Sequence, residues 1–204
     1  MHWEKTMNAK KDIEQPVTAL FLDCPIITTE RLILRPPHKD DAEEMAILAN
    51  NLNVARMLGT MPHPYSRADA ENFIKKAGLS KGRACVYAIT EADSGRLIGV
   101  GGLHEDHARY EQPYMGYWIG EPYWGKGYAT EASRAMVDLF FKVTTRPVLL
   151  VTARADNEAS KTIIRKCGGK FMTKSIGHHP LLNEKQELEH FHITRESWMG
   201  QIAA

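Results

Sequence analysis

Two glycines spaced by one residue, Gly125 and Gly127, stand where a strand-like run gives way to a helix-like run. Glycine adopts left-handed backbone conformations at little cost, so this spacing allows a tight turn whose N–H groups point into one concavity. A helix that follows adds unpaired N–H groups and the positive end of its dipole. Such a loop suits a phosphate or pyrophosphate group, although glycine pairs also serve ordinary turns.

The elements on both sides of this loop follow from the pattern of apolar residues. Tyr114 to Ile119 is rich in aromatic and β-branched residues and predicts a strand. Thr130 to Val143 predicts an amphipathic helix, because its apolar residues recur at helical spacing. Strand, glycine loop and helix therefore follow one another directly.

The chain before the loop predicts alternating strands and helices. A capping-box pattern at Ser66–Asp69 predicts a helix that stops at Gly78. The turn signature of residues 92–95 joins two strands into a hairpin, and the strand at 114–119 extends it to an antiparallel meander. The remaining segments are a strand at 29–35, a helix that opens at Asp40, a loop over 50–65, and the two hairpin strands at 83–90 and 97–104.

The chain after the loop predicts a buried strand at 147–153 and then a helix that ends at Cys167. Asp156 or Asn157 caps this helix, and Lys161 is expected on its outward face. Two final strands, 171–176 and 189–194, are separated by a loop over 178–186. The predicted class is α+β with a mixed, mostly antiparallel sheet.

Composition narrows the class of protein. The 204 residues, 43% of them hydrophobic, suit one domain at 27–204 that follows an N-terminal appendage at 1–26. The formal net charge of +1 gives no reason to expect a nucleic-acid or membrane partner. The three cysteines are widely spaced, and the N-terminus lacks the apolar run of a signal peptide, so we expect a cytoplasmic protein with reduced thiols.

Five motifs in order resemble the GNAT superfamily of acetyl-CoA-dependent N-acetyltransferases, and most closely its ribosomal-protein N-terminal alanine and serine acetyltransferases. They are Thr-Glu-Arg-Leu-Ile-Leu-Arg at 29–35, Leu-Ile-Gly-Val-Gly-Gly at 97–102, Gly-Tyr-Trp-Ile at 116–119, Tyr-Trp-Gly-Lys-Gly-Tyr-Ala-Thr-Glu-Ala at 123–132 and Asn-Glu-Ala-Ser at 157–160. The resemblance implies an acyl-CoA N-acyltransferase fold with a seven-stranded sheet, splayed after its fourth strand, and about four helices.

The same resemblance assigns the residues that hold the acetyl-CoA co-substrate. The superfamily's pyrophosphate loop, Arg/Gln-x-x-Gly-x-Gly/Ala, falls on residues 124–129, with a tryptophan at the first position. Backbone N–H groups should therefore make most of the contact, with charge from Lys126. The implied binding residues are Ile119, Trp124, Gly125, Lys126, Gly127, Tyr128, Ala129, Thr130 and Asn157.

Acetyl transfer to an amine needs an uncharged amine, a polarised carbonyl and a proton for the departing thiolate. Ser160 lies near the cofactor sulfur by resemblance and could supply that proton, or could instead bond only to the start of its helix. Tyr114 stands where many relatives carry a glutamate base. His104 is the alternative base, or a histidine without a catalytic role, and Glu105 and Glu111 are near in sequence.

The predicted function is N-acetyl transfer from acetyl-CoA to a primary amine, either a protein N-terminus or a small molecule, in a ternary complex. The alternative is a non-catalytic module of GNAT fold that binds acyl-CoA or a partner. Nucleotide sites of the Rossmann or P-loop type are excluded because their motifs are absent. His190 and His192 alternate on a predicted strand, but two ligands do not make a zinc site, so no metal is expected. A monomer and a homodimer remain equally open.

Overall fold

The computed structural model describes residues 24–80, 82–105 and 110–202, and in this part of the chain eight strands form one sheet. The strands are β1 (Ile27–Thr28), β2 (Leu32–Arg35), β3 (Ala84–Glu91), β4 (Leu97–His104), β5 (Tyr114–Ile119), β6 (Val148–Arg154), β7 (Lys170–His179) and β8 (Glu184–Thr194). Their order is β1-β2-β3-β4-β5-β6-β8-β7, and only the β5–β6 pair is parallel. The predicted mixed, mostly antiparallel sheet is confirmed, with eight strands instead of seven because the two-residue β1 pairs with β2.

The helices cover both faces of this sheet. They are η1 (Lys39–Asp41), α2 (Ala42–Ala49), α3 (Leu52–Ala55), α4 (Arg67–Leu79), η2 (Glu121–Tyr123), α5 (Tyr128–Val143), α6 (Glu158–Lys166) and α7 (Arg195–Ile202). Six α-helices in the described residues exceed the four or so expected, because α3 is only four residues long and α7 has no clear apolar spacing. Within these described ranges, no helix combines the length and apolar character needed to cross a bilayer.

Two local signals acted as predicted. Ser66 caps α4 by accepting from the N–H of Asp69, while the Asp69 carboxylate accepts from the Ser66 N–H. Asn157 caps α6 by accepting from the N–H of Ser160. Each cap satisfies a backbone donor that the first helical turn leaves unpaired.

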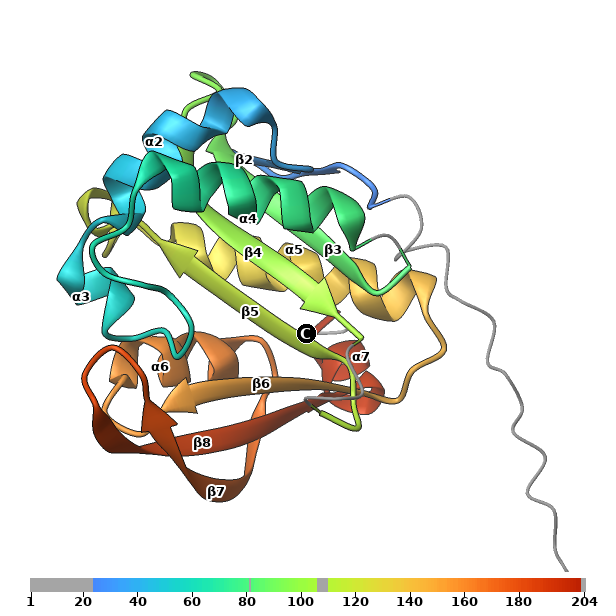
Figure 1. Cartoon of the computed structure of the whole chain (residues 1–204). Coiled ribbons are helices and arrows are strands. Elements are labelled where there is room, and N and C mark those ends of the chain that lie inside the picture. Colours follow the sequence, from blue (N-terminus) through green and yellow to red (C-terminus); the bar gives the residue numbers. More distant parts are fainter. Residues whose placement is uncertain (1–23, 81, 106–109, 203–204) are drawn as a thin grey trace, which may run out of the picture.

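The two faces of the sheet carry separate apolar clusters. Figure 1 shows α4 lying across β3 and β4 on one face, while α5 runs behind the same strands. The cluster under α2 and α4 includes Met45, Tyr65 and Val100, whereas α5, α6 and α7 cover the other face. Side chains on alternate residues of one strand therefore point into different clusters.

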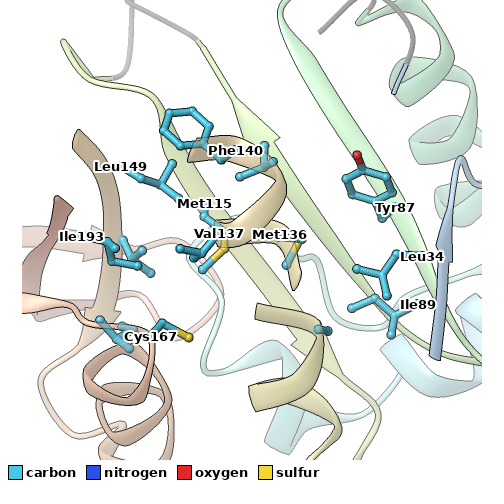
Figure 2. Close-up of a cluster of buried hydrophobic side chains, with 14 of the residues drawn as sticks. Leu34, Tyr87, Ile89, Met115, Met136, Val137, Phe140, Leu149, Cys167 and Ile193 are labelled. Atoms are coloured by element: carbon cyan, nitrogen blue, oxygen red, sulfur yellow. The ribbon is translucent and has the colours of Figure 1, made fainter. Parts of the chain in front are cut away.

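The larger cluster holds α5 against the sheet. In Figure 2, Met136 and Phe140 of α5 lie between Leu34 on one side and Ile193 on the other, and all four are fully buried. Burial of each such side chain contributes about 1.5–3 kcal/mol. Gly101 on β4 permits the close approach, because an added Cβ would lie 2.8 Å from the Met136 methyl carbon.

The sheet opens between β5 and β6. Only Tyr114 and Met115 of β5 pair with β6, opposite Leu150 and Val151, although β5 continues to Ile119. Beyond this point the two strands have no shared ladder, so the backbone groups of β5 that face β6 lack a strand partner. The expected splay of the sheet is confirmed.

Several sequence-based boundaries were wrong. The predicted loop at 178–186 is mostly strand, since β7 extends to His179 and β8 begins at Glu184. Its polar residues resemble a loop because β7 is an exposed edge strand.

Lys161 was expected in solvent but is 5% exposed, and its Nζ donates to the Ala155 carbonyl at 2.6 Å. The appendage predicted at 1–26 falls mainly outside the described residues.

Candidate active site

The glycine loop has the backbone conformation that its sequence predicts. Gly125 has φ of 74° and Gly127 has φ of 84°, both in the left-handed region that favours glycine. No side chain caps α5 at Gly127, so the first N–H groups of the helix face outward without a cap. A Cβ added at Gly125 would meet no atom within 4 Å, which indicates open space above the loop. The loop can therefore receive an anion.

Neighbouring side chains hold this loop in place. The indole N–H of Trp124 donates to the Ile119 carbonyl at 2.6 Å, which ties the loop to the end of β5. Arg31 donates to the Lys126 carbonyl at 2.9 Å and pairs with Glu131 of α5 at 2.6 Å. Burial raises the pKa of Glu131, but hydrogen bonds from Thr29 and from the Arg31 backbone and side chain outweigh it, so the net pKa lies below 4.5.

One cavity of about 1190 Å³ joins the loop to the splay between β5 and β6. Nearly all the predicted site residues line it: Ile119, Trp124, Gly125, Gly127, Tyr128, Ala129, Thr130, Asn157, Ser160 and His104. Lys126 is the exception, because its Nζ lies 5.4 Å from the centre of the Tyr123 ring. The charge expected from Lys126 therefore lies beside an aromatic ring that lines the cavity.

The α5–α6 side of the cavity carries a pair of hydroxyl groups. Tyr117 Oη and Ser160 Oγ lie 3.1 Å apart, and either can donate to the other. Burial raises the pKa of Tyr117 to about 12, so the phenol stays protonated at neutral pH. The sequence analysis assigned no catalytic role to Tyr117. The available signal was strand alternation: Tyr117 lies between Met115 and Ile119, which both pack toward α5 and α6, so its side chain points to the same face.

His104 lies on the other face of the sheet. It stands opposite Tyr114 in the β4–β5 register, and the two rings stack with centroids 4.8 Å apart. Tyr114 alternates with Met115, so it points to the side that α2 and α4 cover. Ser160 and His104 therefore line one cavity from opposite sides of β5.

Among the described residues, His190 and His192 belong to no cluster of three or more possible metal ligands. His190 bonds to Thr152 and Ser175. Among the residues with described positions, no group of three or more His, Cys, Asp or Glu side chains is placed to hold a metal ion.

Comparison with known proteins agrees with this geometry. The family model described as an acetyltransferase (GNAT) domain matches residues 31–170. An uncharacterized N-acetyltransferase, YoaA of Bacillus subtilis, is 30% identical over 146 residues, which are 71% of this chain and 82% of YoaA.

Solved structures share the fold. RimL, a ribosomal L7/L12 α-N-protein acetyltransferase in complex with coenzyme A, matches with a TM-score of 0.73 at 17% identity, over 83% of this chain and 98% of RimL. Spermidine N-acetyltransferase from Vibrio cholerae, in complex with CoA and spermine, has a TM-score of 0.70 at 18% identity, over 84% of this chain and 99% of that chain.

Proposed function

The chain belongs to the GNAT acetyltransferases, and from this premise we propose that it transfers the acetyl group of acetyl-CoA to a primary amine by direct attack in a ternary complex. One observation carries the proposal: a single cavity joins the glycine loop, the Tyr117–Ser160 pair and the acceptor side around His104. Donor and acceptor can therefore meet within one cavity.

The residues present fit the proposed co-substrate. The left-handed glycines and the uncapped start of α5 suit its pyrophosphate, and the open space above Gly125 leaves room for it. Beyond Met115 the backbone of β5 has no strand partner toward β6. Apart from the Ile119 carbonyl, which accepts from Trp124, it can bond to an extended amide arm in the manner of a strand. Asn157 lines the same cavity and presents an amide donor.

The side chains supply what the transfer needs. A neutral amine forms the new C–N bond, the C–S bond of the thioester breaks, and the departing thiolate takes a proton. Ser160 and Tyr117 share a hydrogen bond and can supply that proton. A backbone N–H of β5 at the splay polarises the carbonyl. His104, stacked on the tyrosine that replaces the usual glutamate, is the candidate base.

The charge of the cavity favours a peptide N-terminus over a polyamine. Among the described lining residues Asp69 is the one carboxylate, and it is accompanied by Lys76, Arg154 and Lys166. A polyamine carries several positive charges that would need counter-charges, whereas an N-terminus carries one. We place the reaction in the cytoplasm, where the free thiols of the structure would stay reduced.

A thiol-release assay tests the proposal. Peptides with a free N-terminal Ser or Ala should release CoA thiol, the same peptides with a blocked N-terminus should not, and spermidine should be a poor acceptor. The double variant of Tyr117→Phe and Ser160→Ala serves as the control that keeps the loop intact. Calorimetry that detects no acetyl-CoA binding up to about 1 mM, the upper end of ordinary KM values, refutes the proposal. Binding without release on any amine identifies a non-catalytic module.

A further inference from the structure

Three polar side chains on neighbouring strands form a continuous hydrogen-bonded chain. Thr152 Oγ1 on β6 lies 3.1 Å from His190 Nδ1 on β8. His190 Nε2 lies 2.7 Å from Ser175 Oγ on β7. Both ring nitrogens are therefore bonded to hydroxyl groups, each of which can donate and accept.

The two ends of this chain lie in different surroundings. Thr152 lines the cavity and directly follows Val151, the last β6 residue that pairs with β5. Ser175 is exposed on the edge strand β7. His190 is half-buried between them and does not line the cavity. The hydrogen bonds thus lead from the point where the sheet splays to the protein surface.

The cavity end lies on the acceptor side. Val151 and Ala153 pack into the cluster under α5, so Thr152 between them points to the opposite face. That is the face of His104 and Tyr114, across β5 from the Tyr117–Ser160 pair. An amine that enters from this side would meet the Thr152 hydroxyl at the splay.

His190 is uncharged at neutral pH, so one of its ring nitrogens is free to accept a proton. Burial lowers the pKa of His190, and the nearby His192 lowers it further. Among the residues with described positions, the other titratable group that faces His190 is Tyr110, whose ring centre is 6.3 Å away and whose ring also contacts Tyr114. The groups on β6 and β7 that contact the His190 ring are the hydroxyls of Thr152 and Ser175.

We infer that Thr152, His190 and Ser175 form a relay that carries the proton of the acceptor ammonium from the cavity to solvent, an inference that rests on the proposed function. The ammonium N–H bond breaks and its proton passes to Thr152 Oγ1, while the hydroxyl proton of Thr152 passes to His190 Nδ1. The Nε2 proton of His190 then passes through Ser175 to water. The amine lone pair so freed forms the C–N bond. The second amine proton passes to the candidate base His104, and the Tyr117–Ser160 pair protonates the thiolate. The pair then regains a proton from solvent as His104 releases one, so each turnover releases one proton net.

The experiment compares Thr152→Val, which keeps the volume and removes the hydroxyl, with Thr152→Ser, which keeps the hydroxyl. His190→Gln and Ser175→Ala interrupt the other two positions. Thr173→Val is the matched control, because Thr173 is paired with His190 on β7 but its hydroxyl donates to the Lys174 carbonyl at 3.4 Å. The probe is acetyl-CoA with a peptide that has a free N-terminal Ser, assayed for thiol release across pH.

We expect Thr152→Val, His190→Gln and Ser175→Ala to lower kcat at neutral pH by about 100-fold, the lower end of the range for proton-transfer catalysis. KM for acetyl-CoA should not change. The loss of kcat in these three variants should become smaller as the pH rises above about 8, because the α-amino group of the peptide is then largely neutral when it binds. Thr152→Ser and Thr173→Val should behave as wild type.

Two results would overturn the relay alone: kcat of Thr152→Val equal to that of Thr152→Ser at neutral pH, or a deficit of the same size at every pH, which would indicate altered packing. A wild-type protein that binds acetyl-CoA and acetylates no peptide overturns the proposed function, and the relay with it.

Discussion

Replacing Asn157 by Asp or by Ala separates two roles of this side chain. Its Oδ1 accepts the Ser160 N–H at 3.0 Å and caps α6, while the residue also lines the cavity. Aspartate keeps the accepting oxygen but has no N–H₂ group, whereas alanine keeps neither. The cap should therefore survive in Asn157→Asp, and a hydrogen bond donated to acetyl-CoA should be lost in both variants.

The expected magnitudes differ for the two properties. Loss of the cap in Asn157→Ala should cost about 1 kcal/mol of unfolding free energy, which lowers the thermal midpoint by about 2–4 °C in a chain of this size. Asn157→Asp should stay within about 0.5 kcal/mol of wild type, since Asp and Asn cap equally well. Loss of one net hydrogen bond of about 0.5–1.5 kcal/mol should weaken acetyl-CoA binding by about 2- to 12-fold in both variants.

Thermal unfolding followed by circular dichroism and calorimetric titration with acetyl-CoA measure the two effects. Ser66→Ala is the matched control: it removes the cap of α4 and does not line the cavity, so it should lower the midpoint without changing the Kd. The reasoning is refuted if Asn157→Asp is as unstable as Asn157→Ala, or if it binds acetyl-CoA as tightly as wild type.

Three other variants probe the same framework. Tyr117→Phe should lower kcat about tenfold, less than loss of a general acid because Ser160 remains, and an equal kcat would exclude the phenol as donor. Arg31→Ala should raise KM for acetyl-CoA about three- to tenfold, the equivalent of one hydrogen bond, because the loop loses its link to Glu131; an unchanged KM in steady-state kinetics would contradict this. Burial raises the pKa of Asp41, but hydrogen bonds from Arg35 and from the backbone outweigh burial and hold the net pKa below 3.8. The ionised carboxylate therefore adds to the free energy of unfolding above that value, and this stabilisation is lost as the pH falls through the folded pKa. Asp41→Asn should flatten this acid dependence of the thermal midpoint, and an unaltered dependence would contradict the assignment.

The sequence by itself determined the elements whose causes are local. The strands Leu97–His104 and Tyr114–Ile119 were predicted with the observed bounds, because their alternation and turns involve only neighbouring residues. The left-handed glycines at 125 and 127 and the caps at Ser66 and Asn157 are likewise local, since a backbone conformation or a cap needs only a few consecutive residues. The backbone conformation of the glycine loop and the capping of these helices could therefore be predicted from the sequence.

Only the tertiary structure decided which distant side chains meet. Tyr117 and Ser160 are 43 positions apart, and Arg31 and Glu131 are 100 apart, so no local pattern relates them. Lys161 is buried because β8 brings Glu189 to within 3.6 Å of its Nζ, which the helical spacing of α6 cannot show. Such contacts depend on strand order and on which face each residue occupies, and a shift of one residue in register would turn every side chain to the opposite face. For that reason the sequence indicated what binds at the glycine loop, whereas the path for the acceptor's proton emerged only once β6, β8 and β7 were placed side by side.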